Sequence, residues 1–150
     1  MATAIRPPEV TPDVRAGLRL LARLARVAEQ ACQSTGISLP QYRLLVSISG
    51  RSQRASELAL RVGVSRPTLT SLVDGLEQAG SLRRAPVPTD RRGIQLVLTE
   101  AGRVAVERAE DALLHRLSQL VDGDMRKALP LVLSALGPGL DDDIGTTSAR

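Results

Sequence analysis

Apolar residues recur at three- and four-residue steps over three stretches of the chain, residues 13–35, 100–121 and 122–136. This spacing predicts amphipathic helices, and a second apolar stripe in residues 13–35 indicates a helix that is covered on more than one side. A Gly-Pro-Gly run at 137–139 should end the last helix near Leu136. Pro130 lies inside that helix and predicts a kink or a break there.

Shorter elements occupy the middle of the chain. Three further helices are predicted over residues 41–49, 55–62 and 65–79, the first with Pro40 at its start. Residues 94–98 alternate between apolar and polar side chains, as in a half-buried strand, and should pair with a second short strand at 82–86 across a polar tip. We therefore expect a mainly α fold with a small β-hairpin (α+β).

The two ends of the chain lack either period. Residues 1–12 contain Pro7 and Pro8 and should form a flexible arm, and residues 137–150 should form a disordered tail. The remaining residues 13–136 are enough for one domain with a buried core. Neither a membrane-spanning run nor a secretory signal is expected from the apolar runs, so we expect a cytoplasmic protein with no membrane partner.

Composition removes several classes of function. The 150 residues include one Cys, one His and one aromatic residue, Tyr42. A disulfide within the chain and a zinc site built on Cys and His are therefore excluded, and no cofactor is expected. Binding of single strands by aromatic stacking is excluded as well. No phosphate-binding Gly-rich loop, paired-acid motif or metal cluster is present, so we do not expect an enzyme.

The basic charge is concentrated in the middle of the chain. The net charge of the whole chain is +4, and residues 51–92 carry eight Arg against four acids, whereas residues 93–150 are net acidic. An Arg guanidinium matches phosphates and guanine edges with a planar fork. The charge pattern thus locates a candidate nucleic-acid surface in the central helices and the hairpin.

Residues 57–72 have the spacing of a helix-turn-helix. Ala59 is small where two helices cross closely, and Gly63, four residues later, suits a tight turn. Ser65 is a good N-cap for the second helix. That helix presents short polar side chains and an Arg outward, which suit base edges and phosphates in a major groove. These residues are Arg66, Thr68, Thr70 and Ser71.

The hairpin follows the second helix directly, and its tip carries Arg91 and Arg92 beside Asp90. A hairpin in this place is a wing, and an Arg of a wing can enter the minor groove. The sequence therefore predicts a winged helix-turn-helix that binds double-stranded DNA.

The run from Asp90 to Gly102 resembles the wing signature of the MarR family (multiple antibiotic resistance regulators), Asp-x-Arg followed by alternating apolar residues and Leu-Thr-x-x-Gly. Further positions match the family's recognition helix, and the resemblance extends over residues 13–136. These positions are Leu69, Val73, Leu76, Glu77 and Gly80. Three residues depart from the pattern: Gly75 within the helix, Ser81 in place of a large apolar residue, and Pro40 in place of a hydroxyl cap.

The resemblance implies a homodimer in which residues 13–35 and 100–136 form the dimerisation helices and residues 40–98 the DNA-binding lobe. It implies a transcriptional regulator of a near-palindromic duplex, most often a repressor released by a small amphipathic or phenolic ligand. By the same match, Asp90 would brace the wing, Arg92 would contact DNA, and Arg91 is a second candidate.

The candidate residues fall into three groups. The expected DNA-contacting residues are Arg54, Ser56, Ser65, Arg66, Thr68, Thr70, Ser71, Arg84, Arg91 and Arg92. Tyr42 and Arg43 are candidates for binding the small-molecule effector. The dimer interface is expected to use Leu20, Leu24, Leu113, Leu117, Leu129, Val132, Leu133 and Leu136, because these leave more apolar surface than one lobe covers.

Two other interpretations remain open at this stage. The chain could be a partner-binding protein of the same fold that has lost DNA binding, as an antirepressor would. Cys32 could make it a redox-responsive regulator, although a thiol near the end of the first helix favours a buried structural role. His115 is expected on the surface or in the dimer interface.

Overall fold

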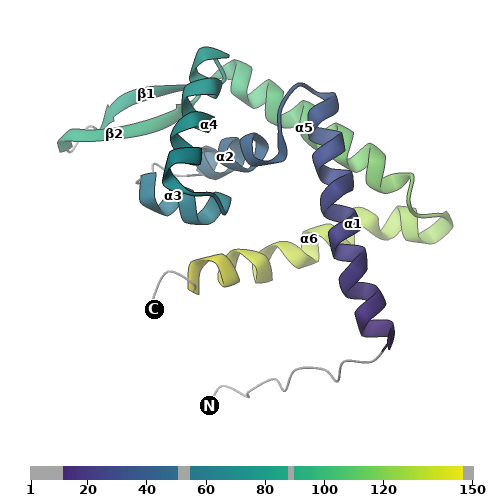
Figure 1. The fold of residues 1–150 in the computed structure, drawn as a ribbon. Coiled ribbons are helices and arrows are strands. Elements are labelled where there is room, and N and C mark those ends of the chain that lie inside the picture. Colours follow the sequence, from purple (N-terminus) through teal and green to yellow (C-terminus); the bar gives the residue numbers. More distant parts are fainter. Residues whose placement is uncertain (1–11, 51–54, 88–89, 147–150) are drawn as a thin grey trace.

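The computed structural model describes residues 12–50, 55–87 and 90–146. It is mainly helical with one two-stranded antiparallel hairpin, which confirms the expected fold class (Figure 1). The elements in chain order are α1 (Pro12–Ser34), α2 (Leu39–Gly50), α3 (Ala55–Val62), α4 (Arg66–Gln78), β1 (Leu82–Val87), β2 (Asp90–Leu98), α5 (Glu100–Ser118) and α6 (Gly123–Thr146).

Helices α2, α3 and α4 pack with the hairpin into one lobe. Its core is aliphatic, and Leu44, Leu45, Leu58 and Leu76 are almost completely buried in it. Each of these helices places its apolar residues on one side, and burying that side is the main favourable contribution to folding. The lobe therefore holds α4 at a fixed orientation with its other face toward solvent.

Helices α1 and α5 pack against each other outside this lobe and cross in Figure 1. Three small residues of these helices are buried, Ala31 and Cys32 on α1 and Ala109 on α5. Large apolar side chains elsewhere on α1, α5 and α6, and one in the turn after α5, stay exposed in the single chain. They are Leu20, Leu21, Leu114, Leu120, Leu131, Val132 and Leu133. None of the helices in the described ranges is long and apolar enough to cross a bilayer.

Hydrogen bonds fix the start of α5 to the end of α4. Thr99 is the N-cap of α5, and its hydroxyl accepts the Gly102 N–H at 3.0 Å and donates to the Gly80 carbonyl at 2.6 Å. The Thr99 N–H donates to the Ser81 carbonyl at 3.2 Å. Since residues 80–81 join α4 to β1, these bonds make α4, the hairpin and α5 meet at one junction.

Two expected boundaries were wrong. The second strand begins at Asp90 rather than Ile94, and Asp90 pairs with Val87 across a register shift between Pro86 and Val87. The last helix does not end near Leu136 but continues to Thr146, through residues that we expected in a disordered tail. Each proline in it removes one N–H, and the Leu- and Ala-rich sequence between the prolines favours the helix enough to continue it.

A hydroxyl cap is present at the start of α2 despite Pro40. Ser38 supplies it two residues earlier, since the Gln41 N–H donates to the Ser38 hydroxyl at 3.3 Å. The Gln41 side-chain carbonyl in return accepts the Ser38 N–H at 2.8 Å. This reciprocal pair is a capping box, and Pro40 occupies a first-turn position where its missing N–H is not needed.

Candidate nucleic-acid interface

The turn between α3 and α4 is held by its backbone and by one Arg from α2. Gly63 has a φ of +74°, which a side chain would strain, and its N–H and that of Val64 both donate to the Ala59 carbonyl at 3.0 Å. The Arg43 guanidinium lies over this turn and donates to the Arg61 carbonyl at 3.4 Å. A cation at the C-terminal end of α3 is favourable to the helix dipole.

Ser65 begins α4 as expected. Its hydroxyl accepts the Thr68 N–H at 3.3 Å and lies 2.8 Å from the Thr68 hydroxyl, so both side chains take part in capping the helix. Leu69, Val73 and Leu76 bury the inner face of α4. The exposed face, around the rest of the helix, carries Arg66, Thr68, Thr70 and Ser71 within its first two turns.

The hydroxyls in the middle of this face donate to their own helix. Thr70 donates to the Arg66 carbonyl at 3.1 Å, and Ser71 donates to the Pro67 carbonyl at 3.2 Å. With the hydrogens engaged in this way, both oxygens present lone pairs outward. In this arrangement they suit base-edge donors, such as the exocyclic amino groups of cytosine and adenine.

Arg84 on β1 does not extend into solvent as a free cation. Its guanidinium donates to Asp74 Oδ1 at 2.5 Å and to Glu77 Oε2, and both acids lie on α4. The hydrogen bond to Asp74 is the largest of several effects that raise the pKa of Arg84. The expected DNA contact is thus engaged within the protein, between the recognition helix and the hairpin. Sequence analysis missed these two acids as its partners.

The backbone of the basic residues of the hairpin tip lies at the start of the second strand. Asp90, Arg91 and Arg92 belong to the start of β2, and Asp90 is paired with Val87. Their side chains lie outside the described ones, as does that of Ser56 on α3, and Arg54 lies outside the described residues. Bracing by Asp90 and DNA contact by the two wing arginines therefore stay predictions.

Tyr42 and Arg43 contact different elements. The Tyr42 hydroxyl donates to Glu110 Oε1 on α5 at 3.4 Å, whereas Arg43 lies over the turn after α3. Burial, followed by the charge and hydrogen bond of Glu110, raises the pKa of Tyr42 to about 12. The described contacts do not gather the two residues around one site.

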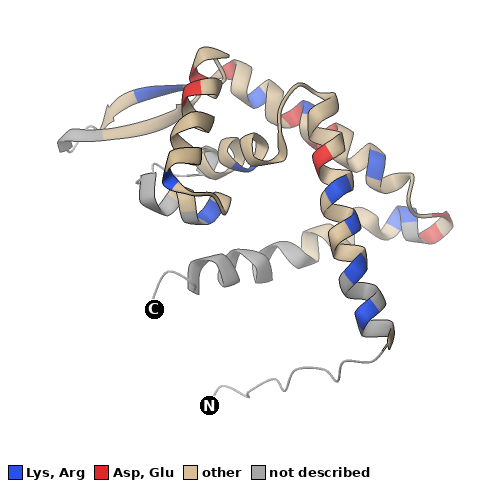
Figure 2. Cartoon of the chain, viewed as in Figure 1, with Lys and Arg blue, Asp and Glu red and all other residues tan. Residues whose placement is uncertain are grey.

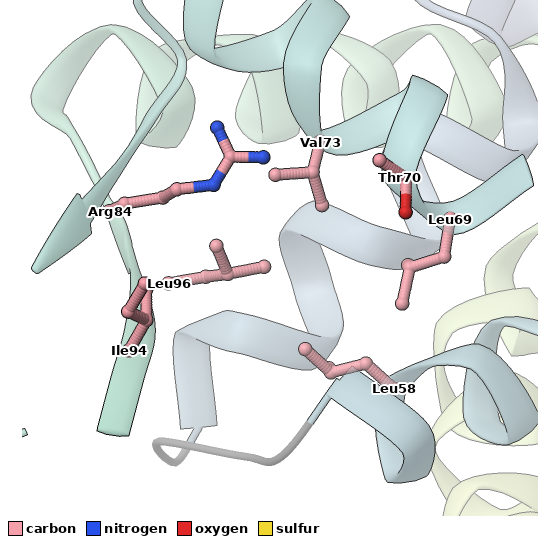
Figure 3. A pocket seen from close by; sticks show the side chains of 7 residues that line it. All are labelled: Leu58, Leu69, Thr70, Val73, Arg84, Ile94 and Leu96. Carbon is pink, nitrogen blue, oxygen red and sulfur yellow. The ribbon is translucent and has the colours of Figure 1, made fainter. Parts of the chain in front are cut away.

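A cavity of about 220 Å³ lies between α4 and the hairpin (Figure 3). Its walls are aliphatic except for Thr70 and Arg84, whose side chains reach it from α4 and from β1. The aliphatic wall consists of Leu58, Leu69, Val73, Ile94 and Leu96. Side-chain packing between the recognition helix and the wing is therefore incomplete.

Charge is distributed unevenly over the lobe. Basic residues lie on β1 and at the start of α4, and acidic residues follow near the end of α4 (Figure 2).

Cys32 is fully buried, and burial, with a smaller effect of Glu29, raises the pKa of its thiol. A buried, protonated thiol is a poor nucleophile, which favours the structural role over the redox-responsive one. His115 is exposed and bonded to the Gln119 side chain at 3.0 Å.

Comparison with known proteins finds similarity to transcriptional regulators. The sequence profile of the MarR family matches residues 35–93. The chain is 30% identical to the HTH-type transcriptional regulator PecS of Dickeya dadantii, over 55% of this chain and 52% of PecS, so it spans about half the length of that relative. It is 25% identical to the HTH-type transcriptional repressor YetL of Bacillus subtilis, over 77% of this chain and 71% of YetL.

A solved structure shares the fold. Sco3205, a MarR family transcriptional regulator from Streptomyces coelicolor crystallised in complex with DNA, is 24% identical and has a TM-score of 0.59. The match covers 90% of this chain and 92% of that one, including the helices on both sides of the lobe. These three proteins are transcriptional regulators by name and not enzymes, in agreement with the expectation from the sequence.

Proposed function

We propose that the chain, which matches the MarR family profile over residues 35–93, is a member of that family and a homodimeric transcriptional regulator that binds double-stranded DNA in the cytoplasm. One observation carries the proposal: α4 buries Leu69, Val73 and Leu76 in the lobe and exposes its Arg and hydroxyl side chains beside a β-hairpin. A helix held in this way can enter a major groove while the hairpin reaches the neighbouring minor groove. The DNA complex of Sco3205, which has the same fold, supports this docking.

Dimerisation is supported by the apolar surface outside the lobe. Leu20, Val132 and Leu133, three of the expected interface residues, are exposed in the single chain. Four more are half-buried, and the side chain of Leu136 lies outside the described ones; the four are Leu24, Leu113, Leu117 and Leu129. Burial of apolar surface contributes about 25 cal/mol per Å², so a second copy is the natural cover for this face.

The finer part of the proposal is repression relieved by a small amphipathic or phenolic ligand. The name of YetL supports the repressor role. The cavity beside α4 supports a ligand there, because its wall is mostly aliphatic and suits the apolar part of a small amphipathic molecule. Tyr42 and Arg43 remain the alternative place. Benzoate is a suitable probe: it should release duplex from the wild type, and less from Leu96→Phe, which fills the cavity.

Selection of bound fragments from random duplex DNA tests the main proposal. We expect a near-palindromic consensus with half-sites about one turn (about 10 bp) apart, bound in a salt-dependent way. Failure to enrich any duplex at low salt would refute DNA binding. It would instead favour the partner-binding interpretation, in which the protein has the same fold but has lost DNA binding.

A further inference from the structure

Arg84 joins the wing to the recognition helix through two acids one helical turn apart. Its Nη2 donates to Asp74 Oδ1 at 2.5 Å, and its Nη1 donates to Glu77 Oε2. A planar guanidinium can hold two carboxylates in this way, whereas a Lys ammonium has no such fork. We call Arg84, Asp74 and Glu77 the wing clasp.

Glu77 also binds the backbone of the wing. Its Oε1 accepts the Arg84 N–H at 3.1 Å, so one carboxylate takes both the main chain and the side chain of the same residue. An N–H of β1 that the ladder leaves unpaired is thus satisfied by α4. These bonds fix the strand itself, and not only a long side chain, to the helix.

The cavity next to the clasp makes these polar bonds more important. Arg84 lines the cavity with Val73 and Leu96, and about 220 Å³ between helix and hairpin remains unfilled. Close packing normally gives an element one orientation; here Leu82 and Leu98 pack against the core at the base of the hairpin, and the packing is interrupted farther along, beside the clasp. The clasp is a polar contact beyond that packed base, and it can set the angle between α4 and the rest of the wing.

We infer that Arg84 is a positioning residue for DNA binding: through Asp74 and Glu77 it holds the wing at a fixed angle to α4 and does not itself contact DNA. This inference rests on the proposed function. The side chains of Arg84, Asp74 and Glu77 are 37%, 58% and 35% exposed, so the clasp should add little to global stability. Its effect lies in geometry, because the wing and the recognition helix must meet two grooves at once.

The direction in which Glu77→Gln changes the affinity for DNA tests the inference. The clasp has two acids against one Arg and is net negative, so it repels DNA as a charge. If only charge mattered, removal of the Glu77 carboxylate would tighten binding. If the clasp positions the wing, the same change weakens specific binding, by about fivefold per protomer for an exposed pair.

The chain offers matched controls for both charges. Arg83 precedes Arg84 on β1, is exposed, makes no ion pair with any described residue, and lies on the opposite face of the strand. Arg83→Gln therefore removes the same charge without touching the clasp. Glu107 on α5 is exposed, and Glu107→Gln removes an acid away from the wing.

The experiment combines two readouts on the full chain. Fluorescence anisotropy with the selected duplex gives Kd and its salt slope, the slope of the logarithm of the binding constant against that of the salt concentration. Hydrogen exchange of the DNA-free protein reports how well the backbone amides of the hairpin and of the end of α4 are protected. Arg84→Gln and Glu77→Gln should each weaken binding about 5- to 25-fold over two protomers and speed exchange of the hairpin. The double variant should be no weaker than Arg84→Gln alone. Arg84→Lys should restore neither readout, and both controls should leave exchange unchanged.

Two results would overturn the inference. One is that Glu77→Gln binds DNA more tightly than the wild type, as expected if it acts only by removing a negative charge, like Glu107→Gln. The other is unchanged exchange in Arg84→Gln together with a fall in salt slope equal to that of Arg83→Gln, which would make Arg84 a phosphate contact. If the wild type bound no duplex at all, the proposed function would fail, while the exchange measurement would still decide whether the clasp fixes the wing.

Discussion

Gly102 in the first turn of α5 lies directly against the carbonyl oxygen of Ser81, so closely that a Cβ on Gly102 would overlap that oxygen. The same Cβ would lie 2.6 Å from Leu98 Cδ1. Both neighbours belong to the junction of α4, the hairpin and α5, and the Ser81 carbonyl is backbone that cannot rotate away. The glycine of the Leu-Thr-x-x-Gly motif is therefore explained by close approach rather than by its own backbone angles.

We expect Gly102→Ala to destabilise the fold by about 1–3 kcal/mol, the usual cost of overpacking a filled site. Gly75→Ala is its control, since a Cβ there meets nothing within 4 Å and Ala is the better residue within a helix. That change should stabilise by about 0.5–1 kcal/mol. Urea unfolding followed by circular dichroism measures both, and equal effects of the two changes would contradict this explanation.

Arg66→Ala and Thr70→Ala should relax base preference at fixed positions of the selected site, by about 1–3 kcal/mol for a base-reading contact. Both residues lie on the exposed face of α4, where a major groove would be read. Arg108→Ala on α5 removes an exposed Arg away from that face and should leave the preference unchanged. Repeating the selection with each variant measures the change, and an unaltered consensus for Arg66→Ala would exclude it as a reading residue.

Arg92→Ala should weaken binding to cognate and scrambled duplex alike, because the minor groove distinguishes base pairs poorly. The salt slope should fall by about 0.9 for each phosphate that is no longer neutralised, and twice that in a dimer. Asp90→Ala should act in the same direction if Asp90 braces the wing, although it removes a repulsive charge. Salt titrations of the two variants measure both effects, and tighter binding by Asp90→Ala would end the bracing role.

Leu133→Asp should shift the protein toward monomer, because it places a charge in an apolar face that we expect a second copy to cover. Val46→Asp is a matched control, since Val46 is a comparably exposed apolar residue on α2, outside that face. Light scattering at micromolar concentration gives the mass. A monomeric wild type would remove the dimer from the proposal, whatever the variants do.

The tyrosinate absorbance should titrate with a pKa near 12 in the folded protein, above the usual value of 10. Since the chain has one Tyr and no Trp, this signal reports Tyr42 alone. The raised pKa means that the folded state holds its proton more tightly than the unfolded state. The stabilisation is present below pH 10 and is lost as the pH rises from 10 toward 12. Glu110→Gln should lower the pKa, and a midpoint near 10 in the folded wild type would contradict the Tyr42–Glu110 contact.

Periodicity predicted the elements that depend on local sequence. The caps at Ser65 and Thr99 and the turn at Gly63 could be read directly, because each depends on residues within one helical turn. The extension of β2 to Asp90 could not, since residues 90–93 do not alternate with apolar ones and Asp90 pairs with Val87 only once the hairpin has formed.

The role of Arg84 depends on the tertiary structure. From the sequence it is one Arg among eight in the basic segment, and its partners lie seven and ten residues earlier on another element. Only the folding of the hairpin back along α4 brings the three charges together. Tyr42 and Arg43, in contrast, are adjacent in the sequence but are separated by the fold. Consecutive residues of a helix point about 100° apart, so the two side chains contact different elements.

In the proposed dimer, the bonds of Thr99 to residues 80 and 81 would make α5 a stiff lever arm between the contact of the two copies and the DNA. Its 19 residues span about 28 Å. A tilt of about 7° at the far end would move the recognition helix by about 3.4 Å, the rise of one base pair. In a dimer the two arms act on a site of fixed spacing, so a small rotation where the copies meet is enough to carry both helices out of register with their half-sites.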